Sequence, residues 1–177
     1  MPIERADVGC WVVRGNADAG GSTTAAATAT GGTTAAGSTP ATTGPASQEW
    51  CLARTYRSRL VEPGDLVVRY LGGQKTPGIV ELGRVTHPVA PAAGDDKPVV
   101  RYAAVALREP VTRQVLKDDP VLSGCELIRL GRAANPLHLT PEETLALTAY
   151  LETKDLERAG WPQRRAENPF TPSDRQD

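Results

Sequence analysis

The sequence is poor in the residues that build metal centres and disulfide frameworks. Its 177 residues include three cysteines, none in a Cys-x-x-Cys pair, and two histidines. A structural zinc site needs four soft ligands at short spacing, and a disulfide framework needs paired cysteines. We therefore expect no metal, no cofactor and no disulfide, and we interpret the cysteines as reduced side chains packed like small hydrophobic groups.

Long apolar runs and an excess of one charge are missing as well. No run approaches the ~20 apolar residues of a membrane span, and residues 1–10 lack the apolar core of a signal peptide. The formal net charge is −1, so no global field would draw the protein onto nucleic acid. We expect a cytoplasmic protein with no membrane partner, in which any anionic ligand meets a local basic patch.

Catalytic motifs are scarce. The stretch GGQKT lacks the spacing and the ending of a phosphate-binding loop, and no Ser-His-Asp set is evident. We interpret His87 and His138 as structural or solvent-facing. The weak candidates for a nucleophile or general base are Asp65, Glu81 and Cys51. The residues that a mechanism needs are too few, so we expect no enzyme.

One segment has a composition that cannot form a core. Residues 17–47 contain only Ala, Asp, Gly, Ser, Thr and Pro, which predicts a disordered insertion. The sixteen residues before it are too few to fold alone, so they must pack with the chain beyond the insertion. Residues 1–153 are thus expected to form a single domain. Residues 154–177 are predicted to be a polar tail from which Trp161 or Phe170 could dock back.

Patterning along the rest of the chain predicts a small sheet with short helices. Strand-like composition marks residues 9–16, 66–70, 79–85 and 98–108. Helices are expected at 49–60, 112–117 and 140–151, and a short extended segment at 125–130. Thr140, Pro141 and Glu143 have the spacing of a capping box. The order of elements indicates an α+β domain around a curved, mainly antiparallel sheet, as in a meander or barrel wall.

Six motifs follow one another along the chain: GCWVVRGN, W…RTYRSR, PGDLVVRY, PGIVELGRV, VRYAAVALREPVT and NPLHLTPEE. Their order resembles that of the EVE domain family of the PUA-like superfamily, whose relatives include the YTH readers of methylated adenine. The family's motif positions are filled by Trp50, Arg54, Tyr56, Arg59, Gly64, Asp65, Pro77, Gly78, Ile79 and Val80. The resemblance covers residues 9–151 without the insertion.

The resemblance implies a compact β-barrel flanked by short helices, with a pocket for a flipped-out, modified base of DNA or RNA. Any nuclease or RNA-processing effector would be a separate chain. Two departures concern the pocket. The insertion replaces a structured segment of the family, and Gly15-Asn16 stands where some relatives have Ser-Glu-Pro.

A base reader needs flat apolar faces, a polar edge and cations for the flanking phosphates. Aromatic residues make up only 5% of the chain, yet residues 50–60 hold two of them beside three arginines. The candidate pocket residues are Arg14, Asn16, Trp50, Tyr56, Tyr70, Gly78 and Asn135. The candidate phosphate-binding residues are Arg54, Arg59 and Arg129.

Each assignment has a structural alternative. Trp50, Tyr56 and Tyr70 could each be a buried ring, as is expected for Trp11. The two asparagines could simply shape turns, and Gly78 could serve a hairpin. We expect Arg57 to solvate an exposed helix face. If the pocket exists, the rings of Trp50, Tyr56 and Tyr70 should converge on one cavity with arginines at its rim.

The leading hypothesis is a non-catalytic reader of a modified base, most simply a modified cytosine in DNA. Three alternatives stay open. The first is an RNA-binding module of the same fold that takes tRNA or structured RNA. The second is an enzyme acting on RNA or a modified nucleoside, and the third is a scaffold whose pocket is closed by its own side chains.

Overall fold

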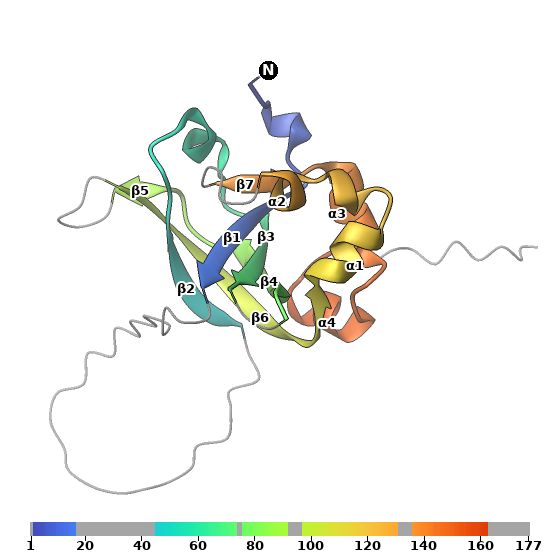
Figure 1. Ribbon diagram of the computed structural model, residues 1–177. Coiled ribbons are helices and arrows are strands. Elements are labelled where there is room, and N and C mark those ends of the chain that lie inside the picture. The colour runs from blue at the N-terminus through green and yellow to red at the C-terminus, as the bar shows by residue number, and fades with distance from the viewer. Residues whose placement is uncertain (1, 17–44, 74–75, 92–96, 131–135, 163–177) are drawn as a thin grey trace, which may run out of the picture.

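The computed structural model describes residues 2–16, 45–73, 76–91, 97–130 and 136–162. These residues form a mixed sheet with its α-helices gathered on one side, which confirms the α+β class predicted from the sequence (Figure 1). The predicted insertion and tail fall largely outside the described residues.

The described residues form seven strands and seven short helices. The strands are β1 (Cys10–Asn16), β2 (Ala46–Cys51), β3 (Leu66–Gly72), β4 (Gly78–Val85), β5 (Ala90–Pro91), β6 (Pro98–Thr112) and β7 (Leu137–Leu139). The α-helices are α1 (Arg113–Asp118), α2 (Glu126–Arg129), α3 (Pro141–Thr148) and α4 (Thr153–Arg158). The 3₁₀ helices are η1 (Arg5–Asp7), η2 (Tyr56–Leu60) and η3 (Leu122–Gly124).

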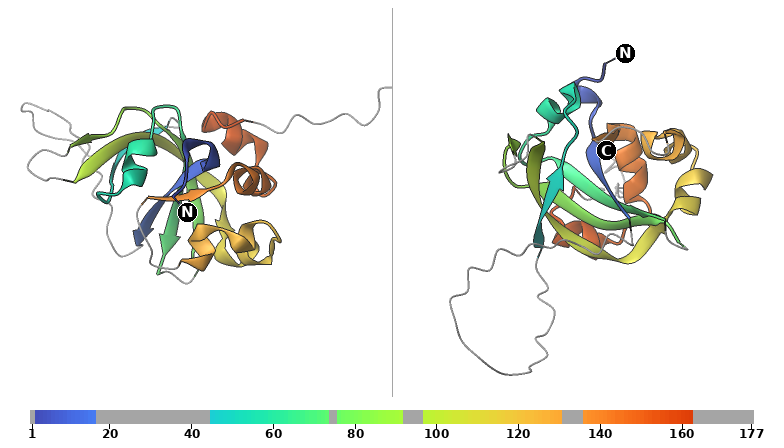
Figure 2. Two further views of the ribbon diagram at one scale, coloured as in Figure 1. Left: turned by 90° about the horizontal axis from the view of Figure 1, so that it is seen from above. Right: turned by 60° about the vertical axis from the view of Figure 1, so that its left-hand side comes forward.

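The strands lie in the order β2-β6-β4-β3-β1-β7, and β5 pairs with β6. The pair β1–β3 is parallel, and the other pairs are antiparallel. Long β6 curves across the molecule and pairs with three strands (Figure 2). Within the described ranges the end strands β2 and β7 do not pair with each other, so the sheet is open where a barrel was expected.

The two faces of the sheet pack differently. One face, which we name the tryptophan face, carries the buried cluster around Trp11, Trp50 and Tyr102. The opposite helix face packs against side chains from α1 to α4, such as Leu116 and Leu147. Strand β6 sends alternate residues to the two faces, because successive side chains of a strand point to opposite sides. The strand predicted for residues 98–108 is thereby confirmed.

Two expected elements are corrected by the structure. Residues 49–60 were expected to form one helix, but β2 extends to Cys51 and only η2 is helical. Pairing with β6, in which Trp50 faces Val100, outweighs the local helix propensity. Residues 125–130, expected to be extended, contain α2 with Cys125 at its N-cap.

The C-terminal part of the fold extends beyond the expected boundary at residue 153. Helix α4 begins at that residue, and its Leu156 is buried on the helix face. Trp161 is also buried there, and its indole nitrogen donates to the carbonyl oxygen of Gly83 at 2.9 Å. The predicted docking of Trp161 is thereby confirmed, whereas Phe170 lies outside the described residues.

Candidate functional site

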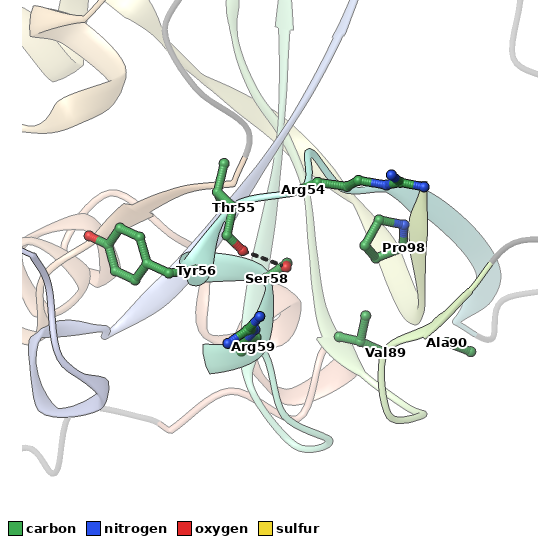
Figure 3. A pocket seen from close by; sticks show the side chains of 8 residues that line it. All are labelled: Arg54, Thr55, Tyr56, Ser58, Arg59, Val89, Ala90 and Pro98. Atoms are coloured by element: carbon green, nitrogen blue, oxygen red, sulfur yellow. Dashed lines mark hydrogen bonds between the residues drawn. The ribbon is translucent and has the colours of Figure 1, made fainter. Parts of the chain in front are cut away.

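An open pocket of about 690 Å³ lies between η2 and the end of the sheet where β5 and β6 pair. Its wall on one side comes from η2 and the residues just before it, and on the other side from Val89, β5 and the start of β6 (Figure 3). The lining residues are Arg54, Thr55, Tyr56, Ser58, Arg59, Val89, Ala90 and Pro98. The pocket therefore combines cationic, polar and apolar surface.

Two of the predicted phosphate-binding residues line this pocket. In Figure 3 the Arg54 side chain lies next to Pro98, and the Arg59 side chain lies apart from it, across from Val89. Arg59 is exposed and has no hydrogen bond or ion pair from its side chain within the described part of the chain. An exposed guanidinium can bind a phosphate with paired donors, and the apolar wall can accept a flat group.

Tyr56 stands at the edge of the pocket. Its ring points away from the other lining side chains toward the N-terminal segment, where its hydroxyl accepts a hydrogen bond from the Ile3 amide at 3.0 Å (Figure 3). That bond, followed by one with Arg57, lowers the pKa of the Tyr56 hydroxyl. The residue is 46% exposed, so its ring is not part of the core.

Two hydroxyl groups lie at the base of the same wall. Ser58 is buried and donates through Oγ to the Thr55 carbonyl oxygen at 2.7 Å, which closes the first turn of η2. The Thr55 hydroxyl oxygen is buried and has no hydrogen-bond partner within the described ranges. An unpaired buried hydroxyl costs roughly 1–3 kcal/mol, so a water or ligand that reached it would be favoured.

The other two candidate rings do not converge on this pocket. Trp50 is buried on the tryptophan face, and Tyr70 is buried on the opposite, helix face. Neither ring is among the lining residues, so the expected meeting of three rings is not observed. Trp50 contributes to the core, which is the structural alternative considered for it above.

The remaining candidate residues are dispersed. Arg14 is exposed, with its guanidinium carbon 5.8 Å from the centre of the Tyr70 ring, and Arg129 is exposed at the end of α2.

The other three candidates are a glycine and two asparagines. Gly78 is buried in β4, where an added side chain would meet the Val111 carbonyl oxygen, so close packing of the strands explains the glycine at this position. Asn16 ends β1, opposite Gly72 of β3. Asn135 lies outside the described residues.

A second polar region lies on the tryptophan face. We name it the polar cluster: Gln48, Arg69, Glu81 and Tyr102, one residue from each of four strands. Glu81 accepts from Arg69 and from the Gln48 amide, both at 2.8 Å, and the Tyr102 hydroxyl donates to Gln48 at 2.8 Å. Burial, followed by the nearby Glu81 charge, raises the pKa of Tyr102 to about 12.

Sequence reasoning did not find the polar cluster as a unit. Its members are separated by 12 to 54 residues, so only the pairing of the strands brings them together. A signal was nevertheless present, because Arg69 and Glu81 are partly buried two residues from Val67 and Gly83 in strands of mainly apolar residues. A charged residue at such a position indicates a partner on a neighbouring strand.

A hydrogen-bonded network behind η2 was also missed. Both terminal nitrogens of Arg57 donate to the Glu126 carboxylate at 2.8 Å, and His138 Nδ1 lies 3.0 Å from the same carboxylate. The prediction that Arg57 solvates an exposed face is therefore wrong. Burial raises the pKa of Glu126, but the bonds from His138 and Arg57 outweigh it and lower the pKa to about 2.

The Gly64-Asp65 motif has a structural role. Gly64 adopts a φ of 92°, which glycine tolerates, and thereby allows the turn before β3. The buried Asp65 carboxylate accepts from the Trp11 indole at 2.7 Å, from the Glu62 amide at 2.9 Å, and from Arg5. The carboxylate thus ties the N-terminal segment and β1 to the turn.

The described residues show no group of three or more side chains that could hold a metal ion, and no helix among them could cross a membrane. None of the three cysteines forms a disulfide. Cys10 and Cys125 are buried as expected, and burial raises the pKa of Cys10 to about 12. Cys51, by contrast, is exposed at the end of β2, which corrects the expectation that all three pack internally.

No protein-family model matches the chain, and no curated protein does. Among solved structures, a hypothetical protein from Leishmania major matches with a TM-score of 0.56 and 15% identity, over 83% of this chain and 96% of that one. A protein from Pseudomonas putida matches with a TM-score of 0.50 and 22% identity, over 58% of this chain and 84% of its own.

Human THYN1, solved in complex with DNA containing 5-methylcytosine, reaches a TM-score of 0.49 at 16% identity, over 59% of this chain and 78% of THYN1. A score below 0.5 carries no conclusion about the ligand of this chain. The first two likenesses show a shared fold and no more, because their sequence identities are below 25%. Membership of the EVE domain family stays a prediction based on the ordered motifs.

Proposed function

We propose that this domain is a non-catalytic nucleic-acid-binding module whose contact surface is the pocket beside η2. The observation that carries the proposal is that Arg54 and Arg59, singled out from the sequence as phosphate ligands, line one open pocket with an apolar wall. The phosphates of a strand would meet the two guanidinium groups. A base turned out of the strand would lie against Val89 and Pro98.

The charge balance supports a local contact of this kind. With a net charge of −1 the protein has no overall attraction for a polyanion, so binding must come from a few exposed cations. Several other arginines are already paired with carboxylates: Arg5, Arg57, Arg69, Arg101, Arg108 and Arg158. Arg59 is therefore one of the cations that are available to a ligand.

The finer proposal is that the base is a modified cytosine in DNA. It is supported by the ordered motifs that resemble a family of modified-base readers. It is also compatible with the apolar wall. An added methyl group that packed against this wall would be removed from water, which would favour binding by roughly 0.8 kcal/mol per buried carbon. RNA of the same sequence is the competing ligand, and the experiment below includes it.

The polar cluster offers a second position for the base. There the Trp50 and Tyr102 rings lie on the same face as fixed donors and acceptors, which are what recognition of a base edge requires. Within the described residues, however, Glu81 already accepts hydrogen bonds from Gln48 and from Arg69. A base would have to replace those bonds, so the pocket beside η2 is the better-supported position.

The proposal is tested by fluorescence anisotropy with short single-stranded and duplex DNA and RNA oligonucleotides that carry cytosine or 5-methylcytosine. We expect the variant Arg54→Ala/Arg59→Ala to bind at least tenfold more weakly, since two phosphate contacts are lost. The control Arg108→Ala/Lys117→Ala removes the same charge from elsewhere. Equal losses in both variants, or no binding of any oligonucleotide by the parent protein, would contradict the proposal.

Two further arms separate the finer alternatives. Val89→Glu should abolish binding if the base lies in the pocket, whereas Gln48→Leu should do so if the base lies at the polar cluster. Competition with tRNA distinguishes a DNA reader from an RNA-binding module. Turnover of the oligonucleotides or of free modified nucleosides would favour an enzyme, and we expect none.

A further inference from the structure

Helix η2 forms one wall of the pocket but has little support of its own. It spans five residues, and no side-chain hydrogen bond caps its N-terminus. Ser58 is its single buried residue, and Leu60, which is partly buried, packs against the tryptophan-face cluster. A 3₁₀ helix of this length is not stable by itself, so contacts from outside must fix its position.

The strongest of these outside contacts is the network of Arg57, Glu126 and His138. Arg57 binds the Glu126 carboxylate through two parallel hydrogen bonds of 2.8 Å, and its Nη1 also approaches the Pro136 carbonyl oxygen at 3.4 Å. The side chains of Arg57 and Glu126 are only 17% and 15% exposed. Paired geometry and shielding from water make this bond stronger than a surface ion pair.

The network reaches the core of the sheet through His138. The Nδ1 atom of His138 is 3.0 Å from Glu126, and the ring is buried edge-on to Trp11, with 6.4 Å between the ring centres. His138 and Trp11 are also register partners in the β1–β7 pair. One wall of the pocket is thus fixed to α2 and β7, whereas the other wall comes from β5 and β6.

We propose that Arg57 and Glu126, oriented by His138, are positioning residues that set the place of η2 opposite β6 and hold the pocket open for its ligand. They contact no ligand themselves, since none of them lines the pocket. This inference depends on the proposed function. Without the network, η2 would occupy the competent position for only part of the time, and the apparent affinity would fall by that fraction.

A competing account makes opposite predictions for one variant. If Arg57 were a reserve cation neutralised by Glu126, removing the carboxylate would release a positive charge beside Arg54 and Arg59 and strengthen binding. In the positioning account the loss of either partner weakens binding. Arg57→Gln and Glu126→Gln therefore act in the same direction in the positioning account and in opposite directions in the charge account.

The experiment measures nucleic-acid affinity against salt concentration for both variants, together with amide hydrogen exchange of the free proteins. We expect both variants to bind about three- to tenfold more weakly with an unchanged slope of log K against log[salt], because the bound state keeps its phosphate contacts. Exchange of the η2 amides should rise in both, and Arg57→Lys should recover part of the affinity.

Asp155→Asn is the matched control for a loss of stability. Asp155 is a buried carboxylate that accepts from the Arg108 amide and from Arg158, and it ties α4 to β6. This variant should leave η2 exchange and affinity unchanged. Tighter binding by Glu126→Gln, or η2 exchange equal to that of the parent, would overturn the positioning role. The exchange result needs no ligand, so it stands even if the proposed function fails.

Discussion

The pocket beside η2 and the polar cluster both contain arginine, but they use its charge differently. In the cluster, Arg69 is paired with Glu81, and Glu81 also accepts from Gln48, so the donors and acceptors satisfy one another. In the pocket, Arg59 has no ion pair among the described residues. The cluster therefore contributes to the fold, whereas the pocket keeps a charge available for an anion.

The same contrast is found within η2. Arg57 and Arg59 are two residues apart, yet one is bound to Glu126 and shielded from water while the other is exposed. The number of arginines in a stretch thus does not identify a binding surface. What decides is which of them the fold leaves without a carboxylate. Four experiments test this distinction, in order of the expected effect.

The largest effect on stability is expected at Glu126. Its pKa is lowered from 4.5 to about 2 in the folded protein, so the stabilisation is fully present above pH 4.5 and is lost as the pH falls toward 2. The difference corresponds to about 3 kcal/mol. Urea unfolding between pH 2 and pH 6 should show this acid-dependent loss, and Glu126→Gln should flatten it. If Glu126→Gln lost as much stability at low pH as the parent protein, the acid dependence would come from other carboxylates.

The next effect is expected at the polar cluster. Glu81→Ala leaves Arg69 and the Gln48 amide without their acceptor, which should lower the free energy of unfolding by about 2 kcal/mol. Arg59→Ala should change it by less than about 0.5 kcal/mol. Urea unfolding of the two variants at neutral pH measures the difference. Similar losses would mean that Arg59 is as much a part of the structure as Glu81.

A smaller effect is expected at Trp161. Trp161→Phe keeps most of the buried ring but removes the bond to the Gly83 carbonyl oxygen, at a cost of roughly 1–2 kcal/mol. Thermal unfolding would show the loss, and nucleic-acid affinity at a temperature where both proteins are folded should not change. A change in affinity would mean that packing on the helix face affects binding at the pocket, which would contradict this prediction.

The smallest effect is expected at Tyr56. Tyr56→Phe removes the exposed bonds that the hydroxyl makes with the Ile3 amide and with Arg57, so the free energy of unfolding should change by less than about 1 kcal/mol. If the ring contacts a base, affinity should be nearly unchanged in this variant and reduced in Tyr56→Ala. If the parent protein, Tyr56→Phe and Tyr56→Ala bound with equal affinity, Tyr56 would not contact the nucleic acid.

Local patterns predicted much of the fold. The alternation in β6 and the capping box at Thr140 were visible in the sequence, because each depends on residues a few positions apart. The helix expected over residues 49–60 failed because β2 is formed by pairing with a strand about fifty residues later. Closure of the sheet could not be judged for the same reason, since it depends on contacts between distant strands.

The candidate site was predictable only in part. Arg54, Tyr56 and Arg59 were found because they are close together in the sequence and remain so in space. The opposite wall was missed, since Val89 and Pro98 have no chemical signature before the fold brings them to η2. Trp50 was assigned to the pocket from its neighbours, but its position in β2 points the ring into the core.

The central claim is that Arg59 contributes an unneutralised charge to nucleic-acid binding. The direct test is the slope of log K against log[salt] for single-stranded DNA, measured for the parent protein, Arg59→Ala and Arg108→Ala. Each lost phosphate contact should reduce the magnitude of the slope by about 0.7. We predict that reduction for Arg59→Ala and none for Arg108→Ala, whereas identical slopes for all three proteins would contradict the claim.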